Sequence, residues 1–447
     1  MPSSASSPVI IVGGGPVGLF TAHVLAAAKI DYILLERHQD IVRHRGALII
    51  IWPPSLRLLD QLGLYERARE IGTRTHTRTT MTQDGQPIPV GSGRLWDVVE
   101  EHLGYPTLGF NRGDFIRLLY ESLPERESRV RTSTEVVRIE TRDDGVQVHL
   151  GDGSVIEGSL VIGADGVHSK TRELMQRMGS AQSATDGALP AGPMVTTYQS
   201  IFGRAPYTNQ DIDKGNFVET HGPGMASQSM RTHDALYFSL IRRLPEPTSE
   251  RGRFTDEDME DMAGAFAEVE VFPGIKFKEL WPARDQTNTQ LLHQEEGLVD
   301  KWHHGRVVLV GDAIHKTTSL WGMGVNTGVN SVAVLANILR QTLRSTPTPS
   351  TQMLDKVFAE YQSARWKECA FVIARSKEVT RAVTWSTPED EVIDRTIPPP
   401  FTMEDAARER VTPFLRQGQL LDFVPFDGKH GSVPWKIVGM STARAML

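Results

Sequence analysis

The sequence predicts an α/β protein with a parallel sheet, and three segments near the N-terminus carry this prediction. Pro8–Val12 is a short apolar run that ends in glycines, as a buried parallel strand does. Pro16–Ala28 follows, with apolar residues at helical spacing. Asp31–Leu35 is a second strand-sized run, closed by Glu36. A strand, a helix and a strand in this order form the β-α-β unit of a parallel sheet.

Length and composition limit the kinds of protein to consider. The chain has 447 residues, so we expect two domains and a tail. The net charge is −7 and no basic stripe is visible, which argues against a nucleic-acid partner. A single cysteine, Cys369, allows no internal disulfide, and the N-terminus does not resemble a signal peptide, so a cytoplasmic location is expected. No apolar run approaches the roughly 20 residues of a membrane span, so no integral span is expected.

Other elements follow from periodicity and from turn residues. Helices are expected at Pro54–Leu62, Arg112–Ser122, Val325–Arg340 and, as one or two helices, Lys356–Trp385. Strands are expected at Met194–Phe202, Ala235–Arg242 and Val307–Gly311, with a hairpin around Asp84-Gly85 between Thr75–Met81 and Pro87–Val90. Gly179–Pro193 has the composition of a linker, and the tail from Thr387 shows no clear periodicity.

A three-stranded antiparallel meander is predicted before the middle of the chain. Val136–Thr141, Val146–Leu150 and Val155–Leu160 alternate or nearly so, and an Asp-Gly pair separates each from the next. Leu160–Gly163 then returns as a buried strand.

The glycines after the first strand form a G-x-G-x-x-G pattern. Gly13 permits a tight turn, Gly15 lets backbone approach a pyrophosphate, and Gly18 lets the helix pack closely on the strand. Glu36, about 20 residues on, is placed to accept hydrogen bonds from ribose hydroxyls. The alternative is a glycine-rich turn beside a solvated carboxylate, but the strand-loop-helix-strand context favours a dinucleotide site. A carboxylate suits an unphosphorylated ribose, so the loop indicates FAD or NAD without deciding between them.

Two further segments resemble the flavin motifs of the para-hydroxybenzoate hydroxylase family of FAD-dependent aromatic hydroxylases. Gly163–Ser169 with Arg172 resembles that family's G-A-D-G-x-x-S-x-x-R segment. Gly311–His315, followed by Gly322–Asn326, resembles its second flavin motif. With Arg112, these motifs cover the chain in the family's order.

The resemblance is closest to fungal members that hydroxylate or epoxidise prenylated indoles and meroterpenoids. Three segments carry this finer resemblance: Asp60–Glu66, Leu421–Pro425 and Val433–Trp435.

The resemblance implies a Rossmann-like FAD-binding domain with a three-stranded meander, a mixed-sheet substrate domain and a helical C-terminal part. It implies that residues 1–75, 107–190 and 285–385 form the FAD-binding domain, that 76–106 and 191–284 bind substrate, and that 386–447 form a tail. FAD is the implied cofactor. NAD(P)H is implied as a cosubstrate that binds transiently and without a Rossmann domain of its own. The absence of a second glycine fingerprint fits this expectation.

The same resemblance suggests roles for individual residues. Asp312 would accept from the ribityl hydroxyls, and Arg112 would hold ribityl or phosphate oxygens. Gly324, Val325 and Asn326 would bring backbone N–H groups at a helix start to the flavin pyrimidine edge, which is anionic in reduced flavin. Asp165 would fix the fold beneath the pyrophosphate turn.

Ordinary structural roles are the alternatives. Asp165 could belong only to a turn, and Arg112 could be a surface charge at a helix start. His315 and Lys316 are interpreted as structural.

Several positions depart from the family's pattern where the flavin ring is expected. The family usually has glycine at Ile50 and Val325 and proline at Ser319. Fungal members have an arginine, a proposed acid in some of them, where this chain has Gln199. Added bulk at Ile50 and Val325 restricts the backbone, and it either reshapes the pocket for a large substrate or impairs flavin binding.

The catalytic candidates are Tyr198, Tyr237 and Arg204, which could line or polarise the substrate pocket. Ordinary sheet packing is the alternative for each. No metal-ligand cluster is evident, and no metal is expected.

Two enzymatic functions remain open from the sequence, beside a protein that simply binds its ligand. The leading hypothesis is an FAD-dependent monooxygenase that hydroxylates or epoxidises a large apolar polycyclic secondary metabolite with NAD(P)H and O2. The alternative keeps the fold but steers a cyclisation or isomerisation without redox chemistry. The altered positions in the ring pocket motivate this alternative.

Overall fold

The computed structural model of the chain describes residues 7–43, 48–88, 91–180, 194–206, 212–396 and 402–439. Its first sheet has six strands in the order β19-β20-β11-β1-β2-β7. Their bounds are β1 Val9–Val12, β2 Tyr32–Leu35, β7 Val130–Arg131, β11 Leu160–Gly163, β19 His303–His304 and β20 Val307–Leu309. β1 pairs in parallel with both β2 and β11, as predicted. Val12 lies opposite both Leu35 and Gly163, so the segments after these residues meet at one edge of the sheet.

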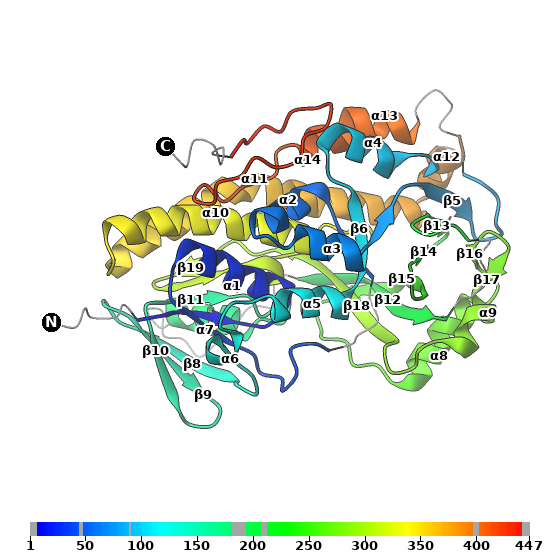
Figure 1. Cartoon of the computed structure of the whole chain (residues 1–447). Coiled ribbons are helices and arrows are strands. Elements are labelled where there is room, and N and C mark those ends of the chain that lie inside the picture. The colour runs from blue at the N-terminus through cyan, green and yellow to red at the C-terminus, as the bar shows by residue number, and fades with distance from the viewer. Residues whose placement is uncertain are drawn as a thin grey trace.

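Helices cover this sheet (Figure 1). Their bounds are α1 Pro16–Ala28, α2 Pro53–Gln61, α3 Tyr65–Ile71, α5 Arg112–Glu121, α6 Arg126–Arg129, α7 Lys170–Ser180, α10 Gly324–Ser345 and α11 Thr351–Val383. α10 packs against both α1 and α11. The buried residues of α10 recur at helical spacing, with Val329, Val332, Ala336 and Leu339 on one face. The predicted Lys356–Trp385 segment is one helix rather than two as far as Val383, where α11 ends.

The predicted meander is confirmed and projects near the N-terminus (Figure 1). Its strands are β8 Val136–Thr141, β9 Val146–Leu150 and β10 Val155–Gly158, all antiparallel. The third strand ends earlier than predicted, because the chain turns at Gly158 to enter β11.

A second, seven-stranded sheet has the order β21-β18-β12-β15-β14-β13-β5. The bounds are β5 Arg78–Thr82, β12 Val195–Ala205, β13 Phe217–Gly222, β14 Met225–Arg231, β15 Leu236–Thr248, β18 Gln290–Leu298 and β21 His315–Lys316. The sheet is mixed, as predicted, because β5 and β13 are parallel while the other pairs are antiparallel. β18 belongs to it although residues 285–385 are predicted in the FAD-binding domain.

One face of the second sheet is covered by α8 (Asp256–Ala265) and α9 (Phe277–Leu280). Ile201, Phe238, Phe266 and Phe277 are the centre of this second core. The opposite face carries Met230, Gln228 and Tyr237. Met230 lies beside Gly109, Tyr237 is bonded to Asn111, and Gln228 donates to the Leu320 carbonyl oxygen. A small antiparallel sheet is formed by β3 (Leu48–Ile51), β6 (Thr107–Asn111) and β4 (Thr73–Thr75), in this order.

The remaining elements are short. They are α4 Leu95–Leu103, β16 Glu270–Phe272, β17 Ile275–Lys276, α12 Pro388–Thr396, α13 Met403–Ala406 and α14 Thr412–Leu415, with 3-10 turns at Trp281–Ala283 and Gly311–Ala313 and a π-helical turn at Ala407–Val411. No helix in the described ranges is long and apolar enough to cross a membrane.

Two expectations from the sequence need correction. The chain reverses at Asp84-Gly85 as predicted, with Met81 bridged antiparallel to Pro87 and backbone hydrogen bonds that join Thr82 to Gln86 and Thr80 to Ile88. The predicted first strand of this hairpin, Thr75–Met81, is instead divided between the end of β4 and the start of β5. The tail contains the short helices α12 to α14, which periodicity missed because each is too short to show a repeat. Pro89 and Val90 of the hairpin, and residues 181–193 of the predicted linker, lie outside the described residues.

Candidate functional site

The glycine loop lies between β1 and the first turn of α1. Gly13 has a left-handed φ of 110°, and a Cβ there would lie 2.6 Å from the Ala164 carbonyl oxygen. A Cβ at Gly18 would lie 1.9 Å from the carbonyl oxygen of Gly13. At Gly15, a Cβ would meet no atom of the described residues within 4 Å. Gly13 and Gly18 therefore serve close packing, whereas Gly15 leaves the N-terminus of α1 open to a ligand.

The Glu36 carboxylate is fixed beside this loop by backbone donors. Its Oε2 accepts from the Gly14 N–H at 2.7 Å, and its Oε1 accepts from the His38 N–H at 3.0 Å. The residue is 8 % exposed. This places the carboxylate at the glycine loop, where the predicted ribose contact requires it.

The Gly163–Ser169 segment is held together by Asp165 and Arg172. The Asp165 carboxylate accepts from the Ser169 hydroxyl at 2.5 Å and from the Thr171 N–H at 2.9 Å. The Arg172 guanidinium donates to the carbonyl oxygens of Val167 and Ala313, at 2.7 and 2.9 Å. Both Asp165 oxygens are thus engaged within the protein, so the geometry favours the predicted bracing role over direct cofactor contact.

Asp312 follows a sharp turn at Gly311, the first residue of the Gly311–His315 motif. Gly311 has a φ of 63°, and a Cβ there would lie 3.1 Å from a methyl of Val17 in α1. Asp312 Oδ2 lies 3.6 Å from Lys316 Nζ. Asp312 Oδ1 lies 3.7 Å from where a Cβ of Gly324 would be, so this carboxylate sits near the N-terminus of α10. The structure therefore gathers the glycine loop, Asp312 and the start of α10 in one region.

The Asn326 side chain joins two segments that are predicted to flank the flavin ring. Its Oδ1 accepts from the Trp52 N–H at 2.9 Å, and its Nδ2 donates to the carbonyl oxygens of Ile50 and Gly322, at 2.8 and 2.7 Å. It is 1 % exposed. Because the amide is fully used within the protein, Asn326 can offer a cofactor only its backbone.

Ile50 lies against the turn that precedes α10. A Cβ at Gly322 would lie 3.3 Å from the Cβ of Ile50. On another side, a Cβ at Gly109 would lie 2.3 Å from the Met230 methyl and 3.4 Å from Ile50 Cδ1. Ile50 and Met230 therefore meet where the strand β3 faces the second sheet. Val325, the second residue of α10, is half-buried against the first core.

The two other altered positions lie in different places. Gln199 points to the α8 side of the second sheet, with its amide against the Arg242 guanidinium, which pairs with Asp261. Ser319 lies in the turn before α10, and its N–H donates to Gln294 Oε1 at 2.9 Å. Only Ser319 of these two adjoins the region predicted to hold the ring.

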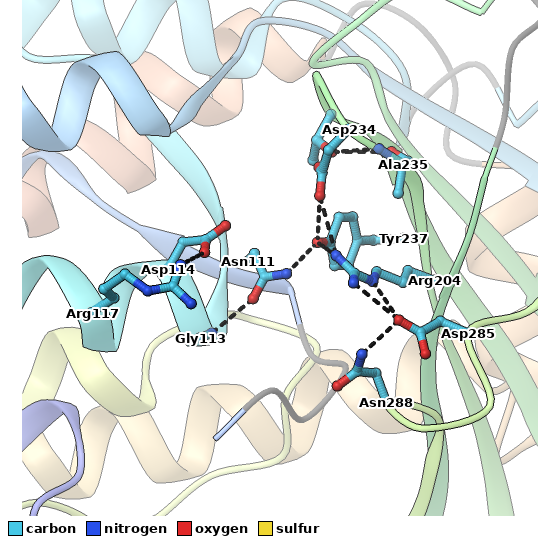
Figure 2. A network of polar contacts seen from close by, with 11 residues as sticks. Asn111, Gly113, Asp114, Arg117, Arg204, Asp234, Ala235, Tyr237, Asp285 and Asn288 are labelled. Atoms are coloured by element: carbon cyan, nitrogen blue, oxygen red, sulfur yellow. Dashed lines mark hydrogen bonds and ion pairs between the residues drawn. The ribbon is translucent and has the colours of Figure 1, made fainter. Parts of the chain in front are cut away.

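The structure brings the catalytic candidates Arg204 and Tyr237 together (Figure 2). Arg204 donates to Asp285 at 2.9 Å and to Asp234 at 3.2 Å. The Tyr237 hydroxyl accepts from Asn111 Nδ2 at 2.7 Å and lies 3.4 Å from Arg204 Nη1. Burial raises the pKa of Tyr237 to about 12, although Arg204 opposes this shift. The phenol therefore stays protonated at neutral pH.

The hydrogen bonds of Tyr198 join it to other residues than Arg204 and Tyr237. The Tyr198 hydroxyl is bonded to Thr384 Oγ1 at 3.1 Å and to Ser386 Oγ at 2.9 Å, and the residue is fully buried. Its environment is the sheet packing that the sequence left open as its alternative. Arg112 is the first residue of α5, half-buried and directly after Asn111.

Sequence reasoning missed Asn111 and Trp52. The Asn111 side chain caps α5 by accepting from the Gly113 N–H at 2.8 Å while its amide nitrogen binds Tyr237. An asparagine directly before a helix is a recognisable capping signal, so the capping role could have been found. Trp52 is 3 % exposed, and its Nε1 donates to no acceptor among the described residues. That orphaned donor has no signal in the sequence.

The residues present fit FAD. The open face at Gly15 and the Glu36 carboxylate suit a pyrophosphate and a ribose. Trp52 Nε1 lies 3.6 Å from where a Cβ of Gly322 would be, so a buried free donor adjoins the turn predicted to face the ring. FAD has anionic, hydroxylated and aromatic parts, which these three groups can bind in turn.

The FAD binding domain family matches residues 6–371, and the chain belongs to this family. It is similar to the FAD-dependent monooxygenase srdH of Neurospora crassa, with 39% identity over 439 residues, which cover 96% of this chain and 98% of that protein. It is also 30% identical over 460 residues to the FAD-dependent monooxygenase ausM of Aspergillus calidoustus, covering 98% and 96%. The chain is thus an oxidoreductase of the FAD-dependent aromatic hydroxylase type, with FAD as its cofactor.

Solved structures confirm the fold. Klebsiella pneumoniae HpxO, complexed with FAD and uric acid, has a TM-score of 0.72 at 21% identity and covers 92% of this chain and 95% of its own. CtdE in complex with FAD and a substrate has a TM-score of 0.69 at 16% identity, covering 92% and 99%. The chain therefore shares its α/β architecture with these two FAD-complexed proteins.

Proposed function

We propose that this flavoprotein monooxygenase transfers one oxygen atom of O2 to a large, predominantly apolar polycyclic secondary metabolite. The other oxygen atom leaves as water, and NAD(P)H supplies the two electrons. The observation that carries the apolar substrate is a row of aromatic rings beside the turn before α10. Trp52 and Trp96 have ring centroids 4.4 Å apart, and Trp96 and Phe217 are 6.3 Å apart, so the row reaches from β3 to the second sheet.

Ile50 and Met230 add apolar side chains to this region, since both lie beside Gly109 and Ile50 adjoins the Gly322 turn with Trp52. The bulk at Ile50, unusual for the family, then shapes a pocket for a broad substrate. Apolar walls also exclude water from the reacting centre. Relatives that are named monooxygenases favour this function over the non-redox cyclisation or isomerisation considered from the sequence.

FAD, when bound, accepts a hydride from NAD(P)H and in its reduced form activates O2. The chain's own groups bind and orient. Gly15 and Glu36 are proposed to hold the dinucleotide end, with Arg112 and Asp312 nearer the ribityl end. Asp165 is proposed to brace the fold beneath the pyrophosphate turn. The N-terminus of α10, at Gly324 and Val325, stabilises negative charge on a pyrimidine edge that faces it.

Arg204 and Tyr237 are proposed to position the sheet rather than to transfer protons. Two carboxylates compensate the Arg204 charge, and the Tyr237 hydroxyl is engaged by Asn111. Together they tie β12 and β15 to Asn111 at the start of α5 (Figure 2). Arg112 is the first residue of that helix. Tyr198 packs beneath the end of α11 and is proposed to have the same kind of role.

Anaerobic stopped-flow absorbance tests the reductant. Either NADH or NADPH should bleach the flavin absorbance of the purified protein, and readmitted O2 should restore it. Screening polycyclic terpenoid and indole compounds should find some that accelerate bleaching and gain one oxygen atom by mass spectrometry. A flavin that neither nicotinamide reduces, with any of these compounds present, would refute NAD(P)H as the electron source.

A further inference from the structure

The turn Ser319–Gly322 receives two side chains from the second sheet. Gln294 of β18 accepts from the Ser319 N–H at 2.9 Å, and Gln228 of β14 donates to the Leu320 carbonyl oxygen at 2.8 Å. The turn is closed by its own hydrogen bond, from the Gly322 N–H to the Ser319 carbonyl oxygen, at 2.9 Å. The Ser319 N–H is thus bound by the amide oxygen of Gln294, and the Leu320 carbonyl oxygen by the amide nitrogen of Gln228.

Glu219 determines which end of the Gln228 amide faces the turn. Gln228 Nε2 also donates to Glu219 Oε1 at 2.8 Å, and the two residues are directly opposite in β13 and β14. A carboxylate accepts but does not donate, so it binds only the NH2 end of the amide. The same NH2 group must then be the one that reaches Leu320.

Glu219 is itself held in place by charged neighbours. It is 2 % exposed, and its Oε2 pairs with the Arg78 guanidinium and lies 3.4 Å from His221 Nε2. His221 Nδ1 in turn lies 2.6 Å from Asp394 Oδ2 of α12. A buried carboxylate with these partners has little freedom to move away from Gln228.

The same turn is held from the opposite side by Asn326, which binds the Gly322 carbonyl oxygen and the backbone of Ile50 and Trp52. Its position is therefore determined jointly by α10, β3 and the second sheet. The turn leads directly into the N-terminus of α10, whose dipole is expected to act on the flavin pyrimidine.

We propose that Gln228 and Gln294 are positioning residues that set the Ser319–Gly322 turn, and with it the start of α10, against the flavin ring. Glu219 orients Gln228. This inference rests on the proposed placement of FAD at the Gly322–Asn326 turn. The midpoint potential and spectrum of the bound flavin would then depend on side chains of the second sheet, where the sequence shows no cofactor motif.

The test compares Gln228→Leu and Gln294→Leu with Gln362→Leu. Gln362 is a matched control, because its amide also links two backbone groups, the Trp302 N–H at 3.1 Å and the Asp300 carbonyl oxygen at 2.7 Å, but on α11. The readouts are the FAD dissociation constant, the visible spectrum of bound FAD, its midpoint potential, and H2O2 formed from NAD(P)H without substrate.

Both turn variants should retain FAD, because the glycine loop is unchanged. Their midpoint potential should fall, since a displaced helix N-terminus stabilises the anionic reduced flavin less. The flavin spectrum should shift and substrate-free H2O2 formation should rise several-fold. Gln362→Leu should leave all these properties unchanged.

A double-variant comparison tests Glu219. Glu219→Gln should shift the potential in the wild-type background but add nothing in Gln228→Leu, because the orientation of Gln228 no longer matters there. Gln228→Asn, which is too short to span both contacts, should reproduce Gln228→Leu if the latter folds poorly.

Turn variants with the wild-type spectrum and potential would overturn the inference, whatever their stability. In that case FAD binding by the wild type would leave the proposed function standing. A wild-type protein that binds no FAD at the turn, shown by an FAD-induced change in tryptophan fluorescence that is the same in the wild type and in Trp52→Phe, would overturn both.

Discussion

The Glu36 carboxylate holds the glycine loop and faces the predicted ribose. Its two oxygens already accept from Gly14 and His38, so it is fixed before any ligand arrives. Glu36→Ala should therefore weaken FAD binding by on the order of 1.5–3 kcal/mol, the usual range for hydrogen bonds to a charged group. Isothermal titration of the flavin-free protein with FAD measures this change.

Glu127→Ala is a suitable control, because Glu127 is an exposed carboxylate on α6. It should leave FAD affinity unchanged. Equal affinities for Glu36→Ala and Glu127→Ala would remove Glu36 from the cofactor site.

His315 is a buried base that should make stability depend on pH. Burial lowers its pKa to about 4, and neither ring nitrogen has a hydrogen-bond partner among the described residues. In the unfolded chain a histidine has a pKa of about 6.5, so the unfolded state binds more protons between these two values. Stability is thus complete above about pH 6.5 and falls as the pH drops toward 4, by roughly 3 kcal/mol for this residue.

His315→Leu should flatten this dependence, because leucine has nothing to protonate. Urea unfolding at several pH values between 4 and 7, with saturating FAD, measures it. His233→Leu, at an exposed histidine, is the control and should keep the wild-type slope. If His315→Leu keeps that slope too, acid sensitivity arises elsewhere.

The helices and strands show how far sequence reasoning reaches. The bounds of α1 match the predicted Pro16–Ala28, and the meander strands match closely, because hydrophobic periodicity and Asp-Gly turns are local signals. The glycine loop and the Asp312 motif were also predictable, and the structure gathers them. By contrast, the parallel pairing of β5 with β13 was not predictable, since it depends on residues far along the chain.

Side-chain contacts between elements could not be predicted in the same way. Nothing in the sequence assigns Gln228 and Gln294 to the turn before α10, or Asn111 to Tyr237. Each of these contacts joins residues tens to hundreds of positions apart. The same limit explains why Tyr198, Tyr237 and Arg204 were grouped, although only Tyr237 and Arg204 bond to each other.

Asn326 fastens β3 to α10, and its loss should affect both stability and the cofactor. Asn326→Ala removes three buried hydrogen bonds, which should lower the free energy of unfolding by about 2–4 kcal/mol. FAD affinity should fall as well, because the turn and β3 separate. Urea unfolding and FAD titration measure the two effects.

Asn337→Ala separates these effects, since Asn337 is on the same helix but binds the backbone of Leu420 and Asp422. It should lower stability and leave FAD affinity unchanged. If Asn326→Ala and Asn337→Ala both retained the wild-type affinity for FAD, the hydrogen bonds of Asn326 would have no effect on cofactor binding.

The C-terminal segment ties the fold together (Figure 1). It lies along α2 and α4, where Gln61 donates to the carbonyl oxygens of Leu421 and Val424, and Trp435 Nε1 donates to the Leu103 carbonyl oxygen at 3.1 Å. A Cβ at Gly431 would lie 2.3 Å from the His102 backbone, so the two segments are in close contact. Much of this packing comes from Leu421–Pro425 and Val433–Trp435, two of the segments that resemble the fungal members of the family.

Removing the large side chains of this segment should destabilise the whole protein. Leu421 is fully buried and Trp435 is 4 % exposed, with its ring 4.4 Å from the Arg57 guanidinium. Trp435→Ala should lower the free energy of unfolding by about 3–5 kcal/mol and Leu421→Ala by about 2–5 kcal/mol, as for other large-to-small core substitutions. Val438→Ala is the control, because Val438 is 72% exposed and should change stability by no more than about 0.5 kcal/mol. Urea unfolding with saturating FAD compares the variants, and Trp435→Ala that is as stable as Val438→Ala would show that the segment adds nothing to the fold's stability.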